Sequence, residues 1–262
     1  MNERLENIET CLQVAREAAE LGGRILLDWR GRFTVREKSP ADLVTEADEA
    51  SQEAIYDYIQ SRFPEHGFLG EEGLNRNPHG SLYQWIIDPL DGTSNYVHGF
   101  PYYGVSIALR RNDKLLVGVI YDPSHQEMFT ALTGGGAFLN GEPICTSGLT
   151  DLSRAMGMAS LPVAPAPNDP AIQRFLVGLQ HLQTVQRTGS AALNLASVAS
   201  GRADIFWSTN LKAWDVAAGI LLVQEAGGTV TNMKGASVDI LVSSLIAAGS
   251  KKIQKQLSDV LN

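Results

Sequence analysis

Hydrophobic residues recur at three- and four-residue intervals near the start of the chain, with charged and polar residues between them. This spacing predicts an amphipathic helix over residues 3–29. A short strand is expected over residues 33–38. A second helix is predicted to begin at Thr45, where Asp48 three positions later can complete a capping box. Pro64 would end that helix.

The middle of the chain is rich in strand-forming residues. Apolar runs separated by Gly and Asn turn signals predict strands over residues 68–70, 85–87, 103–109, 115–121, 127–132 and 137–139. Later in the chain, helices are expected over 170–181, 190–200, 214–226 and 251–261, and strands over 184–187, 203–207, 229–231 and 245–248. The elements together predict an α+β or α/β protein with mixed sheets.

A cluster of prolines between residues 162 and 170 marks the expected boundary between two lobes. The boundary is expected between about residues 142 and 170, and the prolines there mark a loop. We therefore expect an N-terminal α+β lobe, residues 1–142, and a C-terminal α/β lobe, residues 143–262. A chain of 262 residues, 44% of them hydrophobic, is large enough for two closely packed lobes.

The charge and composition of the chain exclude several classes of partner. The formal net charge is −8, and no basic stretch is long enough to grip a nucleic acid. No apolar run approaches the roughly 18 residues that cross a bilayer, and the polar N-terminus lacks the apolar core of a signal peptide. Two isolated cysteines, Cys11 and Cys145, are typical of a reducing compartment. We expect a cytoplasmic protein without nucleic-acid or membrane partners.

The strongest chemical signal lies in residues 85–95, where an apolar run ends in two carboxylates, Asp88 and Asp91. A Gly92-Thr93 step follows at once and can begin a helix. Neighbouring carboxylates suit a hard cation such as Mg²⁺, and free N–H groups at a helix start suit a phosphate. An ordinary Asp-Pro turn is the alternative. A calcium loop is excluded because no glutamate occupies its twelfth position.

Two further acids follow local patterns that are ordinary when taken alone. Glu71 comes after a strand-like segment and a glycine, as a solvated loop acid would. Asp215 begins an apolar helix, where the helix dipole favours an acid. Their occurrence together with Asp88 and Asp91 predicts a metal site built from several carboxylates.

Five blocks of this sequence resemble, in order, motifs of the inositol monophosphatase family. The blocks are DLVTEAD at 42–48, GEE at 70–72, WIIDPLDGTSN at 85–95, GSAA at 189–192 and WDVAAG at 214–219, and EAGG at 225–228 follows. The resemblance covers residues from about 40 to 230. It implies a layered α-β-α-β-α sandwich and a Mg²⁺-dependent, lithium-sensitive phosphomonoesterase, usually a homodimer.

The resemblance also implies which residues hold the metal and the substrate. The implied ligands of two or three Mg²⁺ ions are Glu71, Asp88, the Leu90 carbonyl, Asp91 and Asp215. The implied contacts to the phosphate and to the organic part of the substrate are Gly92, Thr93, Ser190, Ala191 and Asp215.

The implied catalytic residues are Glu71, Thr93 and Asp48. Thr93 would hydrogen-bond the attacking water, and Asp48 would orient Thr93. A threonine hydroxyl is no base, so it can only pass a hydrogen bond on to an acid. Capping of the helix at Thr45 is the competing role for Asp48, and the sequence does not choose between the two.

The substrate is less well defined than the metal site. Family members that act on inositol phosphates commonly carry a glutamate seven residues before the second-lobe aspartate, where this chain has Ser208. The resemblance therefore implies a small polyol or sugar phosphate, most simply inositol 1-phosphate. Histidinol phosphate, fructose 1,6-bisphosphate and nucleotide 3′-phosphates are the alternatives. A relative that binds partners without catalysis is a further one.

Overall fold

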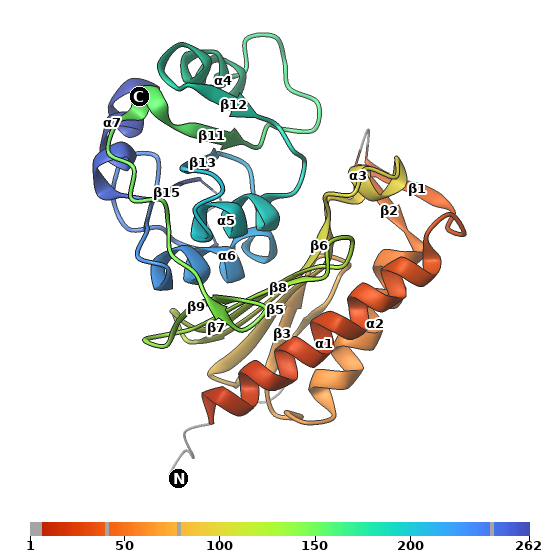
Figure 1. Ribbon diagram of the computed structural model, residues 1–262. Helices are drawn as coiled ribbons and strands as arrows, with labels where there is room; N and C mark the ends of the chain where they lie inside the picture. Colours follow the sequence, from red (N-terminus) through yellow and green to blue (C-terminus); the bar gives the residue numbers. More distant parts are fainter. Residues whose placement is uncertain (1–6, 40–41, 78–79, 242–243) are drawn as a thin grey trace.

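The computed structural model describes residues 7–39, 42–77, 80–241 and 244–262, so residues 3–6 of the predicted first helix lie outside the described part. Its helices are α1 (Ile8–Trp29), α2 (Glu46–Gln60), α3 (Thr93–Val97), α4 (Pro170–His181), α5 (Ala191–Ala199), α6 (Ala213–Glu225) and α7 (Lys251–Leu261), with a 3₁₀ turn at Leu152–Arg154. Helices α1 and α2 lie on one side of the larger sheet, and α5 and α6 lie between the two sheets (Figure 1). Helices α4 and α7 cover the outer face of the smaller sheet. This arrangement confirms the predicted layered α-β-α-β-α sandwich.

The larger sheet has eight strands in the order β10-β9-β8-β7-β6-β5-β3-β4. Their bounds are β3 (Gly67–Gly70), β4 (Asn75–Arg76), β5 (Tyr83–Asp91), β6 (Gly104–Arg111), β7 (Lys114–Asp122), β8 (Glu127–Leu132), β9 (Gly136–Leu139) and β10 (Glu142–Pro143). Only β3 and β5 run parallel among the described pairs of this sheet. A separate hairpin, β1 (Val35–Ser39) and β2 (Asp42–Thr45), leads into α2.

The smaller sheet has five strands in the order β12-β11-β13-β15-β14. They are β11 (Met156–Ala159), β12 (Thr184–Gln186), β13 (Ile205–Ser208), β14 (Thr229–Thr231) and β15 (Leu245–Ala248). Strand β11 runs parallel to β12 and β13, whereas β15 runs antiparallel to both of its neighbours. Both sheets are therefore mixed, as the sequence predicted.

Strand β11 lies in the interval from about 142 to 170, where the sequence placed the boundary between the lobes and predicted no strand. Its sequence, Met-Gly-Met-Ala, lacks the β-branched and aromatic residues that mark most strands. Tertiary packing stabilises this strand. The backbone at Gly157 is so closely packed that a Cβ there would lie 2.5 Å from the side chain of Leu182 and 3.0 Å from that of Trp207. Helix α2 also ends earlier than predicted, at Gln60 rather than near Pro64. The division into two lobes at residue 142 stays a prediction.

Helix α6 is buried between the two sheets, and this placement fixes the position of its first turn. Most of its residues are apolar and shielded from water. A Cβ on Gly118 of β7 would lie 2.7 Å from the Ala218 carbonyl oxygen, so the helix backbone packs directly against the sheet. None of the helices in the described part of the chain has both the length and the apolar character needed to span a bilayer.

Candidate metal centre

A bulge near the end of β5 brings Asp88 and Asp91 to the same side of the sheet. In a regular strand, residues three apart point to opposite faces. Here Asp88 pairs with Ser106 and Asp91 pairs with Gly104, so β5 has one residue more than β6 across this interval. The extra residue changes the alternation of side chains. The Leu90 N–H donates to Asp88 Oδ1 at 3.0 Å, which stabilises the turned backbone.

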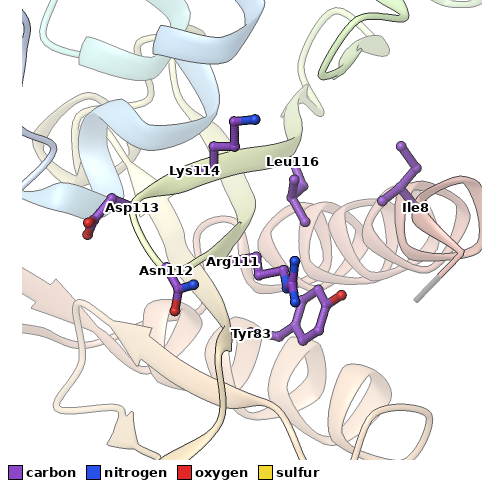
Figure 2. Close-up of a pocket in the computed structure, with 7 residues that line it drawn as sticks. All are labelled: Ile8, Tyr83, Arg111, Asn112, Asp113, Lys114 and Leu116. Atoms are coloured by element: carbon purple, nitrogen blue, oxygen red, sulfur yellow. The ribbon is translucent and has the colours of Figure 1, made fainter. Parts of the chain in front are cut away.

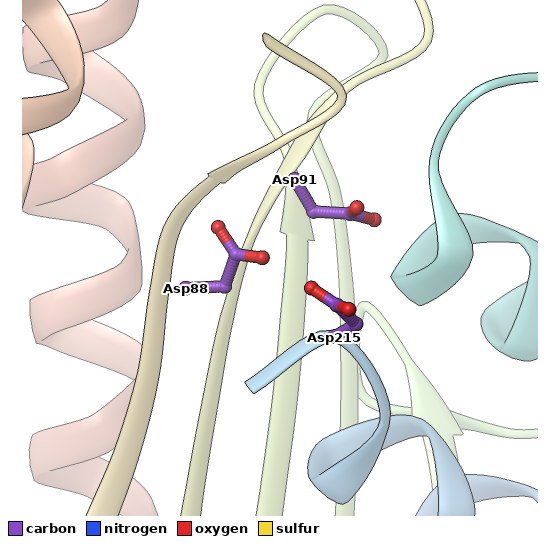
Figure 3. Close-up of side chains that lie close together, drawn as sticks. All are labelled: Asp88, Asp91 and Asp215. Carbon is purple, nitrogen blue, oxygen red and sulfur yellow. The ribbon is translucent and has the colours of Figure 1, made fainter. Parts of the chain in front are cut away.

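Asp215 reaches the same place from the first turn of α6. The Lys212 N–H donates to its Oδ2 at 2.7 Å, so the carboxylate also caps the helix. Carboxylate oxygens of Asp88, Asp91 and Asp215 lie within 4.8 Å of one another. Figure 3 shows the three side chains gathered where the end of β5 meets the start of α6. An all-oxygen cluster of this kind fits a hard divalent cation.

Burial and mutual repulsion raise the pKa of every member of this cluster. Asp88 is 1% exposed, and burial, followed by repulsion from Glu71, holds its pKa well above the usual range. Burial raises the pKa of Asp91 to about 6. Burial and the charge of Asp91 raise the pKa of Asp215 to about 8. Ionisation of all three buried carboxylates at once is unfavourable because their negative charges repel one another. Bound cations or protons relieve this repulsion.

Glu71 stands beside the cluster because β3 and β5 are parallel neighbours. Gly70, the last residue of β3, is in register with Ile87 of β5. The residues that follow these two, Glu71 just after the end of β3 and Asp88 within β5, therefore lie toward the same end of the two strands. Repulsion from Glu71 contributes to the raised pKa values of Asp88, Asp91 and Asp215. Glu71 is not among the three carboxylates whose oxygens lie within 4.8 Å of one another.

Asp91 also binds the N-terminus of α5. Its Oδ2 accepts a hydrogen bond of 2.5 Å from the Ser190 hydroxyl and one of 2.7 Å from the Ala192 N–H. Ser190 is fully buried, and its oxygen accepts the Leu193 N–H at 3.2 Å. The predicted contact of Ser190 with substrate stays a prediction, while its hydroxyl has this partner within the protein. The sequence contains no local signal for this long-range pair.

Asp48 has both of the partners that the sequence left as alternatives. Its Oδ2 accepts the Thr45 N–H at 2.9 Å and the Thr45 hydroxyl at 2.5 Å, which confirms the predicted capping box. Its Oδ1 accepts the Thr93 hydroxyl at 3.2 Å. The Leu90 carbonyl lies 3.2 Å from the same hydroxyl and is a second acceptor. Burial raises the pKa of Asp48 to about 6.

The short helix α3 begins beside the cluster, and two glycines allow its close packing. Gly92 precedes the helix with a φ of 99°, and a Cβ there would lie 3.1 Å from the Tyr102 carbonyl oxygen. The Asn95 side-chain amide donates to the carbonyls of Tyr102 at 2.6 Å and Thr188 at 2.8 Å. Gly189 has a φ of 94° and lies against this amide. The long-range partner of Asn95 could not be found from the sequence.

A cleft of about 440 Å³ opens beside the carboxylates. Asp91, Asp215 and Ala191 line one part of it. Ser208 is not among its described lining residues, because this side chain is 2% exposed at the end of β13.

A second cleft, of about 500 Å³, lies at the far end of the sheet, around the turn between β6 and β7 (Figure 2). Arg111 lies over the ring of Tyr83 there, 5.6 Å from its centre. Asp113 is the one carboxylate among the described lining residues, so this cleft has too few acids to hold a divalent cation.

The layered fold and the carboxylate cluster beside a cleft define the class of protein as a hydrolase of the sugar-phosphatase type. The model of the inositol monophosphatase family matches residues 7–262. The chain therefore belongs to that family of metal-dependent phosphatases, which confirms the resemblance seen in the sequence.

Individual relatives match over nearly the whole chain. The inositol-1-monophosphatase of Mesorhizobium japonicum is 41% identical over 94% of both chains. The Nus factor SuhB of Pseudomonas aeruginosa is 39% identical over 95% of both. The solved structure of inositol monophosphatase from Anabaena superposes with a TM-score of 0.87 at 36% identity, covering 98% of this chain and 96% of that one.

Proposed function

We propose that this protein is a Mg²⁺-dependent phosphomonoesterase that hydrolyses a small polyol or sugar phosphate, most simply inositol 1-phosphate. The observation that carries the proposal is the convergence of Asp88, Asp91 and Asp215 from two distant parts of the chain. Two or three ions would be held by these carboxylates together with Glu71 and the Leu90 carbonyl. Bound Mg²⁺ would offset the negative charge of the phosphate and lower the pKa of a bound water.

The residues at the start of α3 would position the reacting groups. The N–H groups of Gly92 and Thr93 would hold phosphate oxygens at the helix N-terminus. The Thr93 hydroxyl donates to Asp48, so its own oxygen can accept a hydrogen bond from the attacking water. With a pKa of about 6, Asp48 is mostly ionised at neutral pH and keeps this acceptor role. Positioning of this kind supplies much of the catalysis in phosphoryl transfer.

We further propose that the active protein is a homodimer inhibited by lithium, and that it is cytoplasmic. The first two statements follow from the family, and the third follows from the two isolated cysteines, Cys11 and Cys145. Light scattering of the purified protein would measure the mass of the assembly, and a monomer would contradict the first. A lithium titration of phosphate release without loss of activity would contradict the second and with it the expected ion sites.

The experiment that tests the activity is phosphate release from a panel of monophosphates with and without Mg²⁺. The panel should hold inositol 1-phosphate, histidinol phosphate, fructose 1,6-bisphosphate and a nucleotide 3′-phosphate. Release that requires Mg²⁺ and is lost in Asp91→Asn supports the proposal. The matched control is Asp113→Asn, which neutralises an exposed acid at the other end of the sheet. Equal activity of the two variants would refute the site.

A binding role without catalysis is the second candidate, because three of the relatives are named Nus factor SuhB. A fold can be retained when catalysis is lost. The intact set of Glu71, Asp88, Asp91, Thr93 and Asp215 favours the enzyme. Absence of phosphate release across the whole panel would favour the binding role.

A further inference from the structure

Helix α2 lies beside the segments that carry the predicted metal ligands, and three of its polar side chains contact them. Asp48 accepts the Thr93 hydroxyl at the start of α3. Near the middle of the helix, the buried Ser51 hydroxyl donates to the Pro89 carbonyl oxygen at 3.1 Å, within the bulge of β5. The next residue, Gln52, contacts the turn between β3 and β4. One helix therefore touches three separate segments of the candidate metal centre.

The amide of Gln52 holds one residue of the β3–β4 turn at two points. Its Nε2 donates to the Glu72 carbonyl oxygen at 3.0 Å, and its Oε1 accepts the Glu72 N–H at 3.1 Å. A primary amide has both a donor and an acceptor, so it matches the two polar groups of a single backbone residue. A Cβ on Gly70 would lie 2.8 Å from the same Oε1, so the glycine leaves room for this contact.

Backbone hydrogen bonds within the turn give it a defined shape. The Gly70 N–H donates to the Leu74 carbonyl oxygen at 2.6 Å, and the Gly73 N–H donates to the Glu71 carbonyl oxygen at 2.8 Å. These bonds close the turn on itself, while the Gln52 amide fastens it to α2. A movement of the turn relative to α2 would therefore carry Glu71 with it.

The position of Glu71 depends on this turn more than the positions of the three aspartates do. Asp88 and Asp91 lie on β5, inside the larger sheet, and Asp215 lies on the buried helix α6. Glu71 instead precedes β4, a strand of two residues at the edge of the sheet. Its carboxylate is outside the set whose oxygens lie within 4.8 Å of one another. A small shift of the turn could therefore separate Glu71 from a cation held by the aspartates.

We infer that Gln52 is a positioning residue, whose two hydrogen bonds to Glu72 hold the neighbouring Glu71 where it can share a cation with the three aspartates. This inference rests on the proposed function, because it takes Glu71 as a ligand of Mg²⁺. Gln52 itself contacts neither the cation nor the substrate. Residues that orient a metal ligand contribute roughly 10–100-fold to metal affinity. For a half-buried amide that acts through the backbone, we expect about tenfold.

Calorimetric titration of single and double variants with Mg²⁺ tests this role. The variants are Gln52→Leu, Gln52→Met, Glu71→Gln and the combination of Gln52→Leu with Glu71→Gln. Gln254→Leu is the matched control on α7, at the outer face of the smaller sheet. It also removes a side-chain amide bond, the one of 2.7 Å from Gln254 Nε2 to the Thr231 hydroxyl. Circular dichroism checks that each variant is folded.

Gln52→Leu and Gln52→Met should each weaken Mg²⁺ binding about tenfold. The Mg²⁺ concentration for half-maximal phosphate release should rise by a similar factor, while kcat in saturating Mg²⁺ stays near that of the wild type. In the Glu71→Gln background, Gln52→Leu should cause no further loss of affinity, because two changes that act through the same group are not additive. Gln254→Leu should lower the melting temperature and leave Mg²⁺ binding unchanged.

Three results would overturn the inference and leave the proposed function standing. They are an unchanged affinity for Mg²⁺ in both Gln52 variants, a further loss of about tenfold in the Glu71→Gln background, and an equal loss of affinity in Gln254→Leu. The second would mean that Gln52 acts without Glu71, and the third that general destabilisation explains the effect. Absence of Mg²⁺ binding by the wild-type protein would overturn both the inference and the proposed function.

Discussion

Replacement of Asp91 by Asn separates the metal-binding role of this carboxylate from its structural role. Both hydrogen bonds from α5 reach the same oxygen, Oδ2. An Asn side chain whose amide oxygen takes that position keeps the two bonds and loses only the negative charge. The variant is therefore expected to fold, and any change in its stability should reflect the charge.

The magnitude follows from the pKa of Asp91, which burial raises from 3.8 to about 6. A raised pKa means that the folded protein binds the proton more tightly than the unfolded chain, so the fold loses stability as the pH rises. At pH 8 this difference is worth about 3 kcal/mol in the free energy of unfolding. Asp91→Asn should recover most of it in the metal-free protein and raise the melting temperature by roughly 6 °C. The gain should fade between pH 6 and pH 4, where the wild-type carboxyl becomes protonated in the fold.

The assay is thermal unfolding of the wild type and the variant at pH 5 and pH 8, in EDTA and in Mg²⁺. In Mg²⁺ the order should reverse, because the variant has lost a ligand charge. Its phosphatase activity should fall by more than the about 100-fold that changes beside a metal site typically cause. A metal-free variant that is less stable than the wild type at pH 8 would refute the electrostatic reasoning, and near-normal activity would refute the assignment of the ligand.

Three further outcomes test the site. Asp215 has a pKa of about 8, so a bound metal must displace its proton. The rise in melting temperature caused by a fixed Mg²⁺ concentration should therefore grow between pH 6 and pH 9, and a rise that does not change with pH would contradict this. Thr93→Ala should lower kcat by about 100-fold and leave the Mg²⁺-induced rise unchanged, and Thr93→Ser should restore most of the rate; unchanged kcat would remove Thr93 from the mechanism. Ser190→Ala should lower the free energy of unfolding by about 1 kcal/mol, because the cap of α5 is lost. It should also weaken Mg²⁺ binding about tenfold, measured by calorimetric titration, because Asp91 loses the hydrogen bond that orients it. Ser190→Thr keeps the hydroxyl and should change neither the stability nor the affinity for Mg²⁺.

Local sequence patterns predicted the order and type of most helices and strands, because their signals involve residues only a few positions apart. The capping box at Thr45 is one such signal, and the structure confirms it. Strand β11 was missed because close packing around Gly157 stabilises it, and that packing depends on residues far along the chain. The layered sandwich itself came from the family resemblance and not from periodicity.

The candidate site shows the same division between local and distant information. The spacing of Asp88 and Asp91 pointed to a metal, but the bulge that turns both toward Asp215 has no marker in the sequence beyond Pro89. The competition between capping and catalysis at Asp48 could not be settled from spacing, because the carboxylate has two oxygens and each has its own partner.

The single surplus residue in β5 makes its pairing with β6 intolerant of changes in length. Insertion of one residue into β6 between Gly104 and Ser106 would let the two strands realign as a regular ladder, in which Asp88 and Asp91, three residues apart, point to opposite sides of the sheet. Such a chain would retain a well-ordered sheet, and its ability to bind cations would be gone. In this protein, cation binding therefore depends on the number of residues in the paired strands as much as on which residues they are.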